Sequence, residues 1–161
     1  MPITYATIAT TTLGTAAASV TFSSISGSYT DLVLVVSPIS NSGTGVDNSI
    51  QFNSDTGSNY SLTGLYGNGS SGVSYRKSSR TQLDLAYNGT NDNPMLRYNI
   101  MNYSNTNTYK TVVGRNNSGS NVAEAIVGLW RDTAAITSIT IFPSSGNITA
   151  GTFTLYGIKA A

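Results

Sequence analysis

Apolar side chains recur along this chain at every second position or in short runs, and Gly, Ser, Asn and Pro separate these segments. Alternation with a period of two is typical of β-strands that bury one face. The pattern predicts about ten short strands, at residues 3–11, 16–25, 31–37, 49–53, 60–66, 81–87, 95–103, 109–115, 122–130, 136–142 and 152–159, with a strand stub at 73–75.

The run of five apolar residues at 32–36 shows no alternation, so it predicts a central strand that is covered on both faces. Pro38 is expected to end that strand, because proline cannot donate a ladder hydrogen bond. Residues 132–136 are the one stretch where a helical turn competes with extended chain. This spacing favours one all-β domain over residues 1–161, a jelly-roll-like antiparallel β-sandwich, with a β-barrel as the alternative.

The low content of charged residues favours a protein that is part of a larger assembly. Only 9% of the residues are charged, against about 25% in an average domain. A sparsely charged surface resists crowding poorly in solution, but it is tolerable at a fixed position in a particle. The formal net charge of +1 gives no basic face for nucleic acid, and no segment is long and apolar enough for a membrane span. Residues 1–20 lack Lys and Arg, so we expect no signal peptide.

The chain contains no histidine and no cysteine. These absences remove the commonest general base, the usual activator of a serine nucleophile and every thiol. A Ser–Lys pair is formally possible, and a glycosidase needs only two carboxylates, such as Glu124 and one aspartate. Asp84 and Glu124 fall inside predicted strands, where a solvent-facing or ion-paired role is the simpler interpretation. The sequence therefore predicts a protein that is not an enzyme and that takes no cofactor.

Residues 53–59 place oxygen-bearing side chains at alternate positions, as a calcium loop does. Asp55 is the one charged residue among them, whereas a calcium site usually needs several carboxylates. Asn and Asp beside Gly also form tight turns, and we favour this second interpretation.

Two features are candidates for contact with a partner. Three of the eight cations fall within residues 76–80, where they indicate either contact with an acidic partner or a solvated, edge-protecting segment. The ten tyrosines indicate either stacking on a glycan or protein, or a half-buried rim of the core. Trp130 is expected in the core. The predicted contact residues are Arg76, Lys77, Arg80, Tyr66 and Tyr75.

Several segments together resemble a β-sandwich module of virion structural proteins in tailed bacteriophages, including phages of cyanobacteria. In order, these segments are TFSSI (21–25), YTDLVLV (29–35), QFNSDTGSNYS (51–61), LYGNGS (65–70), NY (102–103), YKTV (109–112), GLWRDTAAI (128–136) and FTLYGIK (153–159). The similarity spans nearly the whole chain, and it carries over no catalytic residues.

The resemblance implies a virion component that assembles as a homotrimer and binds the major capsid protein or another virion protein. A capsid cement or decoration protein is the first hypothesis, because the chain shows no long stalk or collagen-like repeat. The alternative is a tail-fibre or receptor-binding head that binds a glycan through loop tyrosines and asparagines.

Overall fold

The computed structural model describes residues 4–43, 45–88, 93–117 and 122–159, and all regular secondary structure among them is β-strand. No helix in these ranges is long and apolar enough to cross a membrane. The strands are β1 (Tyr5–Thr12), β2 (Val20–Phe22), β3 (Asp31–Asn41), β4 (Val46–Phe52), β5 (Tyr60–Gly67), β6 (Gly72–Arg80), β7 (Leu83–Asn88), β8 (Met95–Met101), β9 (Lys110–Asn117), β10 (Ala123–Trp130), β11 (Ile139–Pro143) and β12 (Ile148–Ile158).

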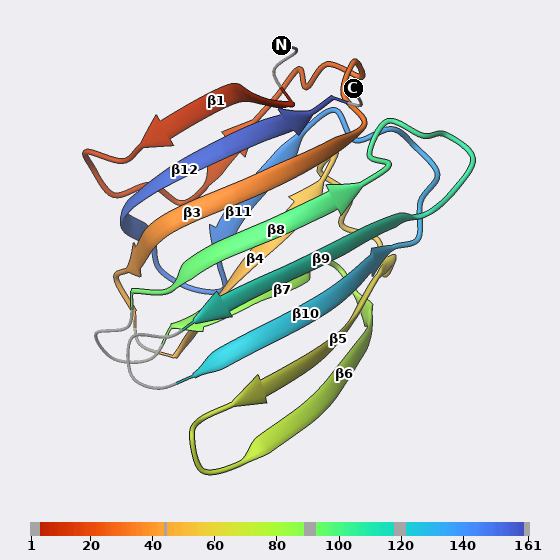
Figure 1. Cartoon of the computed structure of the whole chain (residues 1–161). Helices are drawn as coiled ribbons and strands as arrows, with labels where there is room; N and C mark the ends of the chain where they lie inside the picture. Colours follow the sequence, from red (N-terminus) through yellow and green to blue (C-terminus); the bar gives the residue numbers. More distant parts are fainter. Residues whose placement is uncertain (1–3, 44, 89–92, 118–121, 160–161) are drawn as a thin grey trace.

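The strands form two antiparallel sheets that face one another (Figure 1). The larger sheet has eight strands in the order β1-β12-β3-β8-β9-β10-β5-β6, and the smaller has four in the order β2-β11-β4-β7. The chain crosses between the sheets as in a jelly roll, with the β8–β9–β10 meander in place of a single strand. The predicted all-β sandwich is thus confirmed, and the two separate sheets argue against the barrel.

The unbroken apolar run at 32–36 forms an internal strand of the larger sheet, as predicted, but another sheet covers it on one face only (Figure 1). β3 lies between β12 and β8, and Leu32, Leu34 and Val36 are fully buried against the smaller sheet. Val33, which points to the opposite face, is only 3% exposed.

The expectation that Pro38 ends this strand is wrong, because β3 continues to Asn41. The pairing with β12 shifts register here, so that Ser37 pairs with Thr152 and Ile39 pairs with Gly151. Pro38 is the extra residue of this bulge, where a strand tolerates a residue that cannot donate.

Two further expectations need correction. Residues 73–75 were expected as a stub, but they belong to the nine-residue strand β6, which pairs with β5 along the edge of the larger sheet. Residues 132–136 form no helical turn, and strand β11 begins only at Ile139. Ile136 is nevertheless buried, because its backbone N–H donates to the carbonyl of Tyr103 and docks the segment on the core.

The core between the sheets contains the predicted tryptophan. Trp130 ends β10, is 1% exposed and stacks on the ring of Tyr60 at 6.3 Å between centroids. Phe52 packs beside it at 5.5 Å. The larger sheet has twice as many strands as the smaller one, so the far end of the β5–β6 hairpin projects past the smaller sheet at one edge (Figure 1). Tyr60 and Leu62 of β5 still belong to the apolar core.

Candidate functional site

The five predicted contact residues all lie on the β5–β6 hairpin. Tyr75 and Lys77 pair with inward positions of β5 and point toward the smaller sheet. A bulge at Ser79, whose φ is 53°, returns Arg80 to the same side. Arg76 lies on the opposite side and is exposed. Tyr66 of β5 also faces inward. Four of the five predicted contact residues therefore face the smaller sheet, and only Arg76 faces outward.

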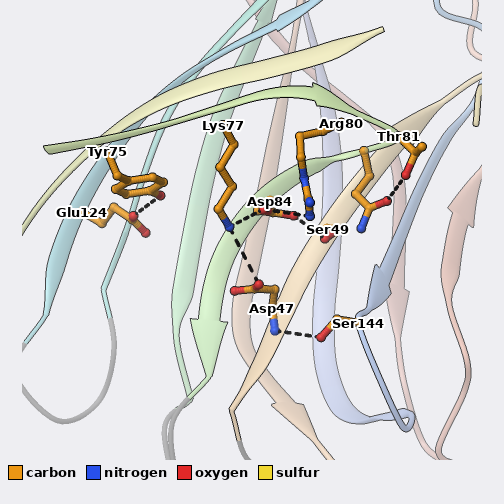
Figure 2. A network of polar contacts seen from close by, with 10 residues as sticks. Asp47, Ser49, Tyr75, Lys77, Arg80, Thr81, Asp84, Glu124 and Ser144 are labelled. Carbon is orange, nitrogen blue, oxygen red and sulfur yellow. Dashed lines mark hydrogen bonds and ion pairs between the residues drawn. The ribbon is translucent and has the colours of Figure 1, made fainter. Parts of the chain in front are cut away.

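The inward cations are neutralised by a buried carboxylate (Figure 2). Asp84 of β7 is 4% exposed, and Lys77 Nζ donates to its Oδ2 at 2.6 Å. Arg80 Nη2 lies 3.7 Å from the same oxygen, and Ser49 Oγ donates to Asp84 Oδ1 at 3.1 Å. Asp47 lies 3.9 Å from Lys77 Nζ. Burial raises the pKa of Asp47, and the charge of Lys77 opposes this shift. Pairing of this kind makes a buried charge tolerable.

A second polar chain adjoins the first. The Tyr75 hydroxyl donates to Glu124 Oε1 (Figure 2), and Asn116 Nδ2 donates to Glu124 Oε2 at 2.7 Å. The Tyr98 hydroxyl donates to the backbone carbonyl of Leu85 and lies 3.3 Å from Asn116 Nδ2. Burial raises the pKa values of Tyr75 and Tyr98, and the negative charge of Glu124 adds to both shifts.

These contacts connect the β5–β6 hairpin to the neighbouring strands. Each oxygen of Asp84 and Glu124 accepts a hydrogen bond from a side chain of the same network. A general acid or base needs an oxygen that faces the substrate. The network instead ties the projecting hairpin to β7 and β10. The role of its residues as partner contacts stays a prediction, and Arg76 is the one whose charge is free for it.

The turn at residues 53–59 is closed around Asp55. Its Oδ1 accepts from the backbone N–H of Gly57 at 2.8 Å, and its Oδ2 accepts from Asn59 Nδ2 at 2.9 Å and Trp130 Nε1 at 2.6 Å. Burial acts to raise the pKa of Asp55, but the three hydrogen bonds together hold it below its ordinary value. Both oxygens therefore face N–H donors, which favours the turn over the calcium loop. The described residues also hold no cluster of three or more His, Cys, Asp or Glu suited to a metal.

The tyrosines mostly serve the interior. Tyr60, Tyr98 and Tyr103 are fully buried, and Tyr66 and Tyr75 pack on one another with ring centroids 6.2 Å apart. The clearly exposed tyrosines come from β1, β7 and the segment before β9, and they share no ring contact; they are Tyr5, Tyr87 and Tyr109. This distribution favours the half-buried rim over a stacking platform for a glycan.

The outer face of the larger sheet carries a feature that the sequence did not flag. It points away from the smaller sheet, and among the described residues no other element covers it (Figure 1). Large apolar side chains are exposed here and are each between 40% and 59% accessible; they are Leu65, Met95, Met101, Val113 and Val127. Arg97 of β8 and Arg115 of β9 are direct cross-strand partners on this face.

A groove of about 900 Å³ crosses this face near the start of β8 and β10. Small residues, Ala123 and Ala125, lie along it, and Leu65 and Met95 flank it. Its charged lining residues are Arg97, Arg115 and Glu124. The available sequence signal was the alternation at 95–101, which sets an arginine between two methionines on one face. The sequence pattern does not show that Arg115 lies beside Arg97, because this depends on the pairing of β8 with β9.

No protein-family model matches this chain, and no curated protein sequence matches it either.

Proposed function

We propose that this protein is a non-enzymatic structural component of a tailed-bacteriophage virion, and that it acts as a capsid decoration protein. The proposal rests on the resemblance of its sequence segments to phage virion modules, and on the broad, uncovered outer face of the eight-stranded sheet. The second of these observations carries the mechanism, because it supplies a surface on which shell subunits can dock.

The outer face is large enough for this task. Eight strands at about 4.8 Å spacing and about seven residues of about 3.3 Å each cover roughly 900 Å². A stable protein interface of standard size buries about 800 Å² on each partner. Exposed Leu, Met and Val side chains on such a face supply the apolar contact area of an interface core. A sheet that spans two shell subunits and binds both would resist their separation.

The fold also suits a passive role. The polar network fastens the one hairpin that projects past the smaller sheet, and buried aromatic rings fill the sandwich behind it. Such a scaffold changes shape little on docking, so binding costs little ordering entropy. We further propose a homotrimer, the assembly that the resemblance implies, and light scattering on the purified protein tests it.

Mass spectrometry and immunogold imaging of purified virions of the phage that encodes the chain test the main proposal. We expect many copies per particle, label on the head, and DNA release at a lower temperature when the gene is deleted. Absence from the virion contradicts the proposal. Deletion without any change in shell stability excludes the cement role. Label at the tail, combined with glycan binding, would favour the alternative of a receptor-binding head.

A further inference from the structure

We propose that the outer-face groove binds an acidic segment of the partner protein, with carboxylates of that segment meeting Arg97 and Arg115. This inference rests on the proposed function, because the partner is then a shell subunit. In this proposal, the docking face recognises the shell subunit through acidic side chains that bind the two arginines.

Within the described part of the chain, no carboxylate pairs with either arginine. They are direct cross-strand partners on β8 and β9, and like charges at such positions destabilise a sheet. Arg97 Nη2 donates to the uncharged hydroxyl of Tyr5 at 3.1 Å, and no hydrogen bond or ion pair reaches Arg115 within the described ranges. A carboxylate bound beside both guanidinium groups would remove the repulsion and form charge-assisted hydrogen bonds.

The described carboxylates of a second copy are already engaged within their own chain. Each described carboxylate already accepts a hydrogen bond or pairs with a cation inside its own chain; the six are Asp31, Asp47, Asp55, Asp84, Glu124 and Asp132. Asp31 is the one carboxylate at an outward position of the described strands of the larger sheet, and it accepts from the backbone N–H of Asn102 at 2.7 Å. Among the described residues, a second copy thus offers no carboxylate that is free of contacts within its own chain.

The rest of the groove favours a protein segment over nucleic acid. Nucleic acid is held by a broad array of cations along its phosphates, whereas this chain has a net charge of +1, and the groove sets two arginines beside Glu124 and several apolar side chains. Leu65 and Met95 offer contact to aliphatic side chains, and the small Ala123 and Ala125 leave room for an extended backbone. The complementary ligand is an extended segment that alternates acidic and apolar residues.

The test uses shells from phage particles that lack the gene and a pelleting assay with added purified protein. Arg97→Gln and Arg115→Gln should each weaken binding about tenfold or more, as expected for loss of a charge-assisted hydrogen bond, and the double variant more strongly. Lys159→Gln is the control, because it removes one exposed positive charge that lies outside the groove and outside the predicted contact residues. Its affinity should stay within threefold of wild type. Equal thermal melting of all variants excludes misfolding.

A second arm probes the partner. Shells whose carboxylates have been converted to neutral amides with a carbodiimide and ethanolamine should no longer bind the wild-type protein. If wild type binds but the double variant binds equally well, or Lys159→Gln loses as much, the groove assignment is wrong while the decoration role stands. Displacement by double-stranded DNA at 0.1 M salt would assign the groove to phosphate and overturn the inference. Failure of the wild type to bind any shell would overturn both proposals.

Discussion

Replacing Gly114 with alanine tests how the tyrosine network is packed. Gly114 of β9 and Tyr98 of β8 are direct cross-strand partners, and the ring of Tyr98 lies flat on the glycine. A Cβ atom at position 114 would meet ring carbons of Tyr98 far inside the 3.4 Å at which ordinary van der Waals contact begins. Tyr98 is fully buried, so its ring has no free space to enter.

The expected cost has two parts. Overpacking a filled core costs about 1–3 kcal/mol. Displacing the ring also separates the Tyr98 hydroxyl from the carbonyl of Leu85, which adds about 1 kcal/mol for a lost buried hydrogen bond. We expect Gly114→Ala to lower the free energy of unfolding by about 2–4 kcal/mol. Tyr98→Phe, which keeps the ring and loses only the hydroxyl, should cost about 1 kcal/mol.

Urea unfolding followed by the fluorescence of the single, buried Trp130 measures these changes. Gly72→Ala is the matched control, because a Cβ atom at that strand position meets no other atom within 4 Å. Its effect should stay within about 0.5 kcal/mol, as is usual for a surface substitution. The packing argument is refuted if Gly114→Ala and Gly72→Ala unfold at the same urea concentration.

Three further predictions follow from the polar contacts. Burial raises the pKa values of Tyr60, Tyr75 and Tyr98 in the folded state, so their contribution to stability is complete below about pH 10 and is lost above it. Phenolate absorbance should therefore appear together with unfolding at high pH, and separate titration of these tyrosines in the folded protein would contradict the assignment. Lys77→Met should destabilise by about 1 kcal/mol, discounted because the side chain is 35% exposed, whereas Arg76→Met should change stability by less than about 0.5 kcal/mol in the same urea assay. Because both oxygens of Asp55 already accept N–H donors, 5 mM calcium should leave the melting temperature unchanged, and a clear rise would restore the calcium-loop interpretation.

At the candidate site, the sequence pattern predicted which charged residues lie together but not which residues they contact. The cation cluster at 76–80 was visible in the sequence as a group of charges, and its place on an edge strand agrees with the edge-protecting interpretation. Its actual contacts depend on Asp84 and Glu124, which two different strands bring beneath the hairpin. Lys110 gives the opposite case, since a lysine is normally exposed. It is fully buried, and its Nζ donates to the carbonyls of Thr108 at 2.8 Å and Thr133 at 3.0 Å.

The sequence by itself determined the fold class and the internal position of the apolar strand at 32–36. Strand formation depends on period-two alternation, β-branched residues and turn residues within a few positions of one another. These features can therefore be recognised in the sequence alone. The order of the strands, the bulge that admits Pro38 and the meeting of Arg97 with Arg115 were decided by the tertiary structure. These features depend on which distant strands pair and in which register, and many pairings satisfy the same local pattern until one apolar core selects among them.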